Sequence, residues 1–301
     1  MGLSEEDWEE LLYAIKDNKC TPFIGAGASA PWLPLGSEIA RDWASKHGYP
    51  LGDSHQLARI AQYLAIKEDN DMYPKNILSR VLKEKRPPDF RLEEHRNTPY
   101  AVLADLNLPI YITTNYDHFM EAALQSRGKD PVSEFCRWNK VGEASGITSV
   151  FDRERQYMPT QARPLVYHLH GIIDKPQSMV LTEDDYIDFI VALSSNNDII
   201  PNAIRRLMAT SSLLFIGYSL EDINFRTIFR GIVDYLGARY QLASMAVLLT
   251  PSGVVESKQN EAQKYLERYT RRMFNIRVYW GTANEFSSEL RKRWNEFIGR
   301  E

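Results

Sequence analysis

The sequence predicts an α/β fold in which helices cover both faces of a doubly wound, mostly parallel sheet, with a small helical insertion. Short apolar runs, typical of buried parallel strands, alternate with segments of helical periodicity. Several of these runs end abruptly in glycine or small polar residues. The chain has 301 residues, of which 44% are hydrophobic and 25% charged, and this composition is typical of a folded globular protein with a sizeable core.

The first third of the chain contains one strand and several helices. Ser4 and Asp7 resemble a capping box at the start of an amphipathic helix. An apolar strand over 21–24 ends in a glycine turn, and a helical pattern follows over 39–44. From about 45 to 100 the pattern is helical and charged, and we interpret this stretch as the insertion.

Regular alternation of strands and helices returns after the insertion. We expect one domain over 1–301, with an irregular connection over 142–163. The predicted strands are 109–113, 165–169, 213–216, 245–249 and 276–279, and the predicted helices are 116–125, 221–236, 255–272 and a C-terminal helix at about 284–299.

Charge and cysteine content exclude several classes of protein. The 36 Lys and Arg against 40 Asp and Glu leave a net charge of −4, so no overall basic field exists, and we expect no direct binding to nucleic acid. Cys20 and Cys136 are too few for a disulfide framework or a four-cysteine zinc site. The acidic amino terminus is unlike an export signal, and no apolar run reaches the roughly 18 to 20 residues of a bilayer span, so we expect a cytoplasmic protein away from membranes.

The first candidate site is the glycine turn after strand 21–24. Gly25 and Gly27 would let a pyrophosphate approach the backbone at the start of a helix, although glycine there also allows a simple bend. A hydride-transferring dinucleotide enzyme would carry an acidic residue about 20 positions later, at the end of a second strand. A helix continues there instead, so we expect a nucleotide to be held in another way.

A second candidate site follows strand 109–113. Thr114, Asn115 and Asp117 lie at its carboxyl end, where open α/β sheets bind ligands. Alternatively, Thr114 or Asn115 would cap the helix predicted from Tyr116, and Asp117 would complement the dipole of that helix. Ligand binding and these helix-end roles are therefore both open.

Two further strands end in small or polar residues. His168 and His170 lie at the end of strand 165–169, where alternation would place both side chains on one face. Gly217 and Ser219 follow strand 213–216, and Ser219 is equally readable as a helix cap. Four strands that deliver such groups to one edge of a sheet are less expected by chance than any one of them.

Together, these four segments resemble, in order and spacing, the NAD-binding and catalytic motifs of the sirtuin superfamily, over about residues 23 to 249. The resemblance implies a Rossmann-like fold, with Asn115 and His170 as the catalytic pair. It implies that the glycine turn and Asp117 hold the nicotinamide riboside and phosphates, and that Gly217 and Ser219 hold the adenosine half. The full set of NAD-binding residues implied in this way is Gly25, Ala26, Gly27, Ser29, Thr114, Asp117, Gly217 and Ser219.

The sequence departs from the protein deacylases of that superfamily. Their zinc module needs two pairs of cysteines, and their Pro-Asp-Phe-Arg element is replaced here by Pro34, Leu35, Gly36 and Ser37. The chain is more similar to the bacterial sirtuin-like group, also marked by the segment 181–186, whose members hydrolyse NAD in anti-phage defence. We therefore expect NAD as substrate, with no zinc or other metal.

The resemblance implies an NAD⁺ hydrolase that releases nicotinamide and ADP-ribose and depletes NAD in antiviral defence. Asn115 would orient the ribose hydroxyls or the water, and His170, with a pKa near neutrality, would be the general base. Two alternatives use the same pocket. One is an NAD-dependent protein deacylase, and the other is a nucleotide-sensing subunit without turnover.

The resemblance also implies control by assembly. Some members of the group work beside a hexameric ATPase of the HerA type, and an unrestrained NAD⁺ hydrolase would kill its own cell. No sensor domain is evident in the sequence, so we expect a homo-oligomer that depends on a partner or ligand. Trp294 and Phe297, on the apolar stripe of the last helix, are the candidate contact residues.

Overall fold

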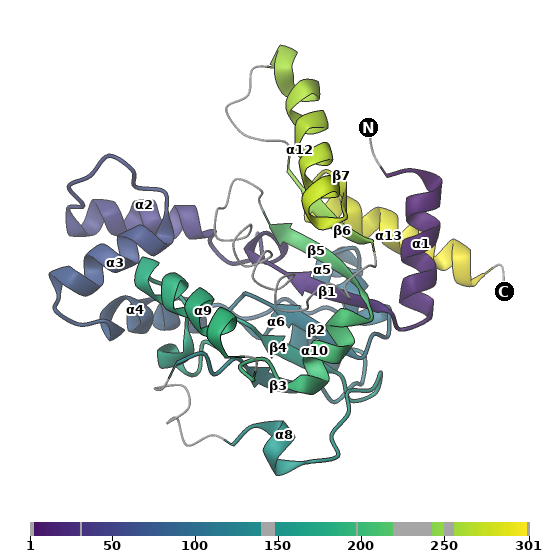
Figure 1. Cartoon of the computed structure of the whole chain (residues 1–301), viewed down its shortest axis with the longest axis horizontal. Helices are drawn as coiled ribbons and strands as arrows, with labels where there is room; N and C mark the ends of the chain where they lie inside the picture. The colour runs from purple at the N-terminus through teal and green to yellow at the C-terminus, as the bar shows by residue number, and fades with distance from the viewer. Residues whose placement is uncertain are drawn as a thin grey trace.

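A computed structural model of the chain describes residues 3–30, 32–139, 148–196, 198–218, 243–249 and 256–299 (Figure 1). Its strands form one sheet in the order β3-β4-β2-β1-β5-β6-β7, and every adjacent pair is parallel. This confirms the predicted doubly wound, Rossmann-like α/β fold. The strands are β1 (Cys20–Ile24), β2 (Ile110–Thr113), β3 (Val132–Phe135), β4 (Leu165–His168), β5 (Ser212–Tyr218), β6 (Ser244–Leu248) and β7 (Ile276–Trp280).

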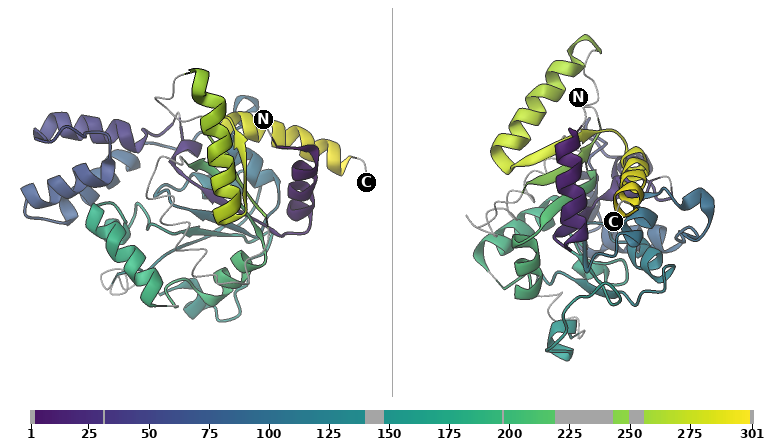
Figure 2. Two further views of the ribbon diagram at one scale, coloured as in Figure 1. Left: turned by 45° about the horizontal axis from the view of Figure 1, so that its top comes forward. Right: turned by 90° about the vertical axis from the view of Figure 1, so that its right-hand side faces the viewer.

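Helices cover both faces of the sheet, because the central strands are buried on both sides. On one face an apolar core includes residues of α1 (Glu5–Lys16), α2 (Gly36–His47), α3 (Leu57–Lys67), α4 (Met72–Lys83), α5 (Pro99–Asp105), α6 (Phe119–Gln125) and α13 (Ala283–Ile298). On the other face a second core includes residues of α8 (Val150–Arg153), α9 (Glu183–Ser195), α10 (Asn202–Ala209) and α12 (Gln259–Phe274). Figure 2 shows α2, α3 and α4 gathered at one end of the molecule and α1 and α13 at the other.

The order of the strands in the sheet determines where the candidate site lies. The chain passes from β1 to β2 on one side of the sheet and later returns to β5 on the other side of β1. The carboxyl ends of β1 and β5 therefore form the point at which the winding direction reverses, and ligands of open α/β sheets bind there. Three of the four predicted motifs follow β1, β2 and β5 directly, and the fourth follows β4 beside β2.

The structure differs from the sequence prediction in several elements. Strand β3 was not predicted, because Ser133 and Glu134 interrupt the apolar pattern of an edge strand. Helix α6 begins at Phe119, three residues later than expected, and helices α9 and α10 were not assigned. The irregular connection contains the short helix α8. The helix expected over 221–236 lies outside the described residues, and among the residues described no helix is long and apolar enough to cross a bilayer.

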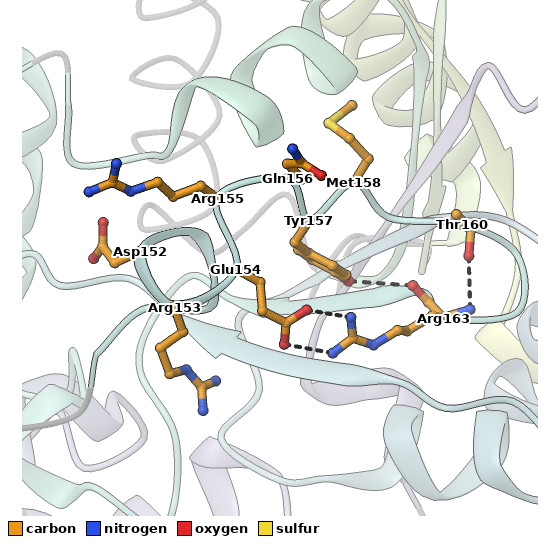
Figure 3. Close-up of a pocket in the computed structure, with 9 residues that line it drawn as sticks. All are labelled: Asp152, Arg153, Glu154, Arg155, Gln156, Tyr157, Met158, Thr160 and Arg163. Atoms are coloured by element: carbon orange, nitrogen blue, oxygen red, sulfur yellow. Dashed lines mark hydrogen bonds and ion pairs between the residues drawn. The ribbon is translucent and has the colours of Figure 1, made fainter.

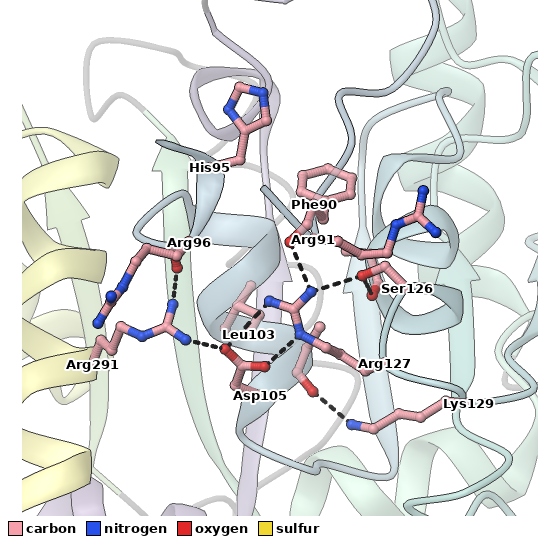
Figure 4. A network of polar contacts seen from close by, with 12 residues as sticks. Phe90, Arg91, His95, Arg96, Leu103, Asp105, Ser126, Arg127, Lys129 and Arg291 are labelled. Carbon is pink, nitrogen blue, oxygen red and sulfur yellow. Dashed lines mark hydrogen bonds and ion pairs between the residues drawn. The ribbon is translucent and has the colours of Figure 1, made fainter. Parts of the chain in front are cut away.

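The last helix, α13, is fastened to both the first helix and the centre of the chain. Trp8 stacks on Phe286 with ring centroids 5.4 Å apart. Asp105, at the end of α5, accepts hydrogen bonds of 2.6 Å from Arg291 and of 2.6 Å from Arg127 (Figure 4). This partly buried network joins α13 to α5 and to the end of α6.

Trp294 and Phe297 also contact this helical layer. Both side chains are partly buried, and Phe297 packs edge-on against Tyr13 of α1 with ring centroids 5.0 Å apart. Part of the apolar stripe on α13 is therefore used for packing within the chain.

Candidate active site

The glycine turn after β1 interlocks with the end of β5. The Gly25 N–H donates to the carbonyl oxygen of Ile216 at 2.8 Å, and Gly217 has a φ of +83°. A Cβ on Gly217 would lie 2.4 Å from the Ala28 nitrogen and 2.7 Å from the Gly25 oxygen, and both are backbone atoms that cannot move aside. A Cβ on Gly25 would likewise lie 2.7 Å from the Gly217 oxygen. These glycines are therefore required by the backbone alone, whatever else they do.

Asn115 is the centre of a buried polar network between β1 and β2. Its side-chain nitrogen Nδ2 lies 3.1 Å from each of the Gly25 carbonyl oxygen, Ser29 Oγ and the Tyr100 hydroxyl. Ser29 and Tyr100 are 2.7 Å apart through their hydroxyl groups, and Ser29 Oγ also donates to Asp117 Oδ2 at 3.3 Å. The fold thus brings together four residues that the sequence places up to 88 positions apart: two NAD-binding candidates, one catalytic candidate and Tyr100.

Asp117 serves the local backbone as well as this network. Its Oδ1 accepts the N–H of Phe119 at 2.9 Å, at the start of α6. Burial is the main reason that the pKa of Asp117 is raised. Asp117 therefore bonds to the first residue of α6 through one oxygen, and its second oxygen faces Ser29.

Thr114 lies where β1, β2 and β5 meet. Its hydroxyl is 3.0 Å from the Tyr218 hydroxyl, and its N–H donates to the Ile24 carbonyl at 3.0 Å. The Tyr218 hydroxyl also donates to the Ile24 carbonyl, at 3.1 Å. Ser219 lies outside the described residues.

His168 is fully buried and bonded at both ring nitrogens. Nδ1 lies 3.0 Å from the backbone carbonyl oxygen of Asn115, and Nε2 lies 2.8 Å from Glu121 Oε1. His118 lies on the other side of the carboxylate, with Nδ1 3.4 Å from Glu121 Oε1 and Nε2 2.8 Å from Asp174 Oδ2. All four ring nitrogens of the two histidines face oxygen acceptors.

This cluster carries charge. Burial opposes the ionisation of Glu121, but His168 and then the hydrogen bond from His118 outweigh it and hold the pKa of Glu121 well below its usual range. The hydrogen bond to Glu121 is the largest cause that raises the pKa of His118 to about 9. Within the described part of the chain, His118, Glu121 and His168 are also the one group of three such side chains placed to hold a metal ion, with ligand atoms within 4.8 Å of one another.

His170 lies on the opposite face of the sheet from His168. Its ring packs edge-on against Tyr186 and Phe189 of α9, with ring centroids 5.5 Å and 5.2 Å away. Burial lowers its pKa to about 3, and Nε2 has no hydrogen-bond partner among the described residues. Both sequence-based expectations for His170 are therefore wrong. It does not share a face with His168, because β4 ends at His168, and its pKa is not near neutrality, because its surroundings are apolar.

The turn after His170 fixes this placement. Gly171 has a φ of +86°, and a Cβ there would lie 2.2 Å from the Ser178 carbonyl oxygen. Only glycine fits, so the backbone requires Gly171 but places no such requirement on the side chain at 170. Within the described part of the chain, no hydrogen bond joins Asn115 and His170.

Sequence reasoning missed Tyr100 and Glu121. Tyr100 lies in an apolar helical run and carried no signal that separates it from a core residue. Glu121 did carry a sequence signal, because a carboxylate within the apolar run 119–124 must be paired when the helix is buried. A histidine three residues earlier, His118, was the nearest available partner.

A surface pocket lies apart from these residues (Figure 3). It is lined by residues between Asp152 and Arg163, and Arg163 forms a two-pronged ion pair with Glu154 at 2.6 and 2.9 Å across it. No predicted site residue lines this pocket.

Comparison with known proteins agrees with the fold. A family described as the SIR2-like domain matches residues 109–274, just over half of the chain. The "NAD(+) hydrolase ThsA" of Cytobacillus dafuensis is 26% identical over 234 residues, which cover 76% of this chain and 41% of that protein. The "NAD(+) hydrolase ThsA" of Bacillus cereus (strain MSX-D12) is 23% identical, with 78% and 42% covered. "Defense-associated sirtuin 2" of Bacillus subtilis is 25% identical, with 73% and 20% covered, so the chain spans less than half the length of each of these relatives.

Proposed function

The chain belongs to the SIR2-like domain family, and from this premise we propose that it hydrolyses NAD⁺ to nicotinamide and ADP-ribose. The observation that carries the proposal is the junction of the Asn115 side chain, Ser29 and Asp117 beside the glycine turn, at the reversal point of the sheet. Relatives named NAD(+) hydrolase support the same substrate.

The reaction breaks the bond between a cationic nicotinamide and ribose, so the ribose gains oxocarbenium character in the transition state. Asn115 is the residue we propose for orienting the ribose hydroxyls or the attacking water, because its Nδ2 shares two N–H groups among three nearby oxygens, which fix the amide in one orientation, so it needs little reorganisation. The Asp117 carboxyl lies in the same network and would face the positive ribose. The backbone N–H groups of the glycine turn would receive the phosphates.

His170 is the proposed base, with Nε2 as the accepting atom. At neutral pH its imidazole is unprotonated, as a base must be. Nε2 is buried without a partner among the described residues, and an unsatisfied buried nitrogen is costly unless a ligand or water bonds to it. A ribose hydroxyl or water at Nε2 would supply that bond and also raise the pKa of His170 toward the working range.

The test is nicotinamide and ADP-ribose release by the parent chain and by Asn115→Ala and His170→Ala. We expect each variant to lose about two to four orders of magnitude in rate with its circular dichroism unchanged. The exposed residues Asn295 and His55 provide matched controls, Asn295→Ala and His55→Ala, which should keep the parental rate. A folded Asn115→Ala or His170→Ala protein with the parental rate would refute the assignment.

An acetylated peptide added to the same assay separates the alternatives. NAD⁺ consumption that requires the peptide would identify a deacylase, and NAD⁺ binding without consumption would identify a sensing subunit. We expect consumption that is independent of the peptide.

We further propose that the chain acts in the cytoplasm as a homo-oligomer in antiviral defence, with a HerA-type ATPase as a candidate partner. The name of the Bacillus subtilis relative supports the defence role. Trp294 and Phe297 remain the proposed contact residues, through the part of each side chain that is not covered by α1. Light scattering beside an NAD⁺ assay across dilution tests the assembly, and a monomer with activity independent of concentration would contradict it.

A further inference from the structure

Asn115 lies in a segment whose backbone is held by side chains. The chain leaves β2 at Thr113, and α6 begins only at Phe119. The N–H of Asn115 donates to Thr113 Oγ1 at 2.9 Å, and its carbonyl oxygen is bonded by His168 Nδ1 at 3.0 Å. Both polar groups of the Asn115 backbone therefore depend on side chains, and only one of the two, His168, comes from another strand.

His168 is itself held in one orientation. Its ring is fully buried, and Nε2 bonds to Glu121 Oε1 at 2.8 Å. The same oxygen accepts from Ser133 at 2.7 Å, and the other oxygen, Oε2, is buried without a hydrogen-bond partner among the residues that the structure describes. The carboxylate is thus turned so that Oε1 faces His168.

Each ring nitrogen of His168 faces an oxygen of another residue. Nδ1 lies 3.0 Å from the Asn115 carbonyl oxygen, and Nε2 lies 2.8 Å from the Glu121 carboxylate. His168 therefore links the backbone of Asn115 to the side chain of Glu121.

We propose that His168, held by Glu121, is a positioning residue that fixes the backbone of Asn115 and thereby aims its side-chain amide at the substrate. The inference rests on the proposed role of Asn115 in NAD⁺ hydrolysis. His168 does not touch the substrate in this role. Loss of its bond releases the Asn115 carbonyl, and displacement of a positioned group by about 1 Å lowers a rate by about 100-fold.

The test compares two substitutions of similar length. His168→Lys keeps a cation with several donors, whereas His168→Met keeps the bulk and removes every donor. We expect His168→Met to lower kcat by about 100-fold with little change in KM, and His168→Lys to stay within about tenfold of the parent. His118→Gln is the matched control, because His118 contacts the same carboxylate but not Asn115, and it should keep the parental kcat within about twofold.

A second variant guards against misfolding. His168→Met leaves the Glu121 carboxylate buried without its main partner, so the double variant Glu121→Gln, His168→Met removes that charge as well. We expect the double variant to fold and to show the same loss of kcat. Parental kcat in a folded His168→Met or double variant would overturn the proposal.

A readout without turnover separates this proposal from the proposed function. In protein labelled with ¹⁵N-asparagine, the side-chain amide signal of Asn115 is assigned by its disappearance in Asn115→Asp. We expect that signal to shift in His168→Met, to return toward the parental position in His168→Lys and to stay in place in His118→Gln. An unmoved signal in His168→Met would refute the positioning role even in an active enzyme, and a moved signal in a parent that does not hydrolyse NAD⁺ would refute only the proposed function.

Discussion

Two regions on opposite faces of the sheet, both beside the end of β4, surround a histidine with opposite kinds of environment. On the α6 side, His168 is enclosed by Glu121 and the Asn115 carbonyl, and every ring nitrogen in the cluster faces an acceptor. On the α9 side, His170 is enclosed by Phe189 and Tyr186, and its Nε2 has no partner among the described residues. The positions are two residues apart, yet one region favours the charged imidazole and the other the neutral one.

The comparison teaches that burial alone does not set the pKa of a histidine. Burial among aromatic rings lowers the pKa of His170 to about 3. In the other region the hydrogen bond to Glu121 is the largest cause that raises the pKa of the partly buried His118 to about 9. The charged region is suited to holding a backbone in place, and the neutral region is suited to accepting a proton.

The largest expected effect separates the two regions by stability. Glu121→Leu removes the anion from the charged region and takes the acceptor away from three groups, on His168, His118 and Ser133, so we expect the free energy of unfolding to fall by about 3 to 5 kcal/mol. His170→Leu conserves volume in an apolar environment and breaks no bond at Nε2, so a loss below about 1.5 kcal/mol is expected. Urea unfolding of both proteins measures the difference, and equal losses would break the comparison.

The next effect is a pH dependence of opposite sign in the two regions. His170 has a folded-state pKa of about 3, below its unfolded value, so the unfolded chain binds the extra proton and stability falls on acidification. We expect this residue to contribute a slope of roughly 1.4 kcal/mol per pH unit between about pH 6 and pH 3.5, which His170→Leu should remove. Glu121 also loses stabilisation in acid, so only the difference between parent and variant isolates His170.

In the charged region the pH dependence appears on the alkaline side. His118 has a folded-state pKa raised to about 9, so its stabilisation is fully present below its unfolded pKa near 6.5 and is lost as the pH rises through 9. The difference between the urea midpoints at pH 6 and pH 9.5 should therefore be smaller in His118→Gln than in the parent. A parental drop that persists unchanged in His118→Gln would assign the effect to another group.

The last prediction is that a chelator has no effect on the chain. If protons occupy the charged region, the purified chain should contain no stoichiometric zinc, and a chelator should leave its unfolding midpoint and its NAD⁺ hydrolysis unchanged. Elemental analysis measures the zinc directly. One zinc per chain that disappears in Glu121→Leu would identify a metal site at His118, Glu121 and His168 and would replace the protonated description.

The order of strands and helices was largely predictable because central parallel strands are apolar throughout and end sharply. Strand β3 was not predicted because it lies at the edge of the sheet, where the polar residues Ser133 and Glu134 are tolerated. The polar residues after β1, β2 and β5 were predictable for the same topological reason, since the carboxyl ends of parallel strands share one edge.

The contacts within the site were not predictable from spacing. Alternation holds only while a strand continues, and β4 ends at His168, so the direction of His170 depends on a glycine turn with a positive φ. The pKa of His170 depends on α9, a helix that was not assigned from the sequence. Tyr100 joins Asn115 through tertiary packing of α5, for which an apolar helical pattern gives no sign.

The interlock of Gly25 with Gly217 affects how related sequences should be interpreted. Since a side chain at either position would meet backbone atoms, a descendant that had lost all activity would still retain these glycines as long as it folded. They report ancestry and architecture, and their presence says little about catalysis. The side-chain amide of Asn115 and the ring of His170, which we propose as the catalytic groups, are under no such backbone requirement. Under that proposal, a search for active relatives should be filtered on those two positions rather than on the glycines.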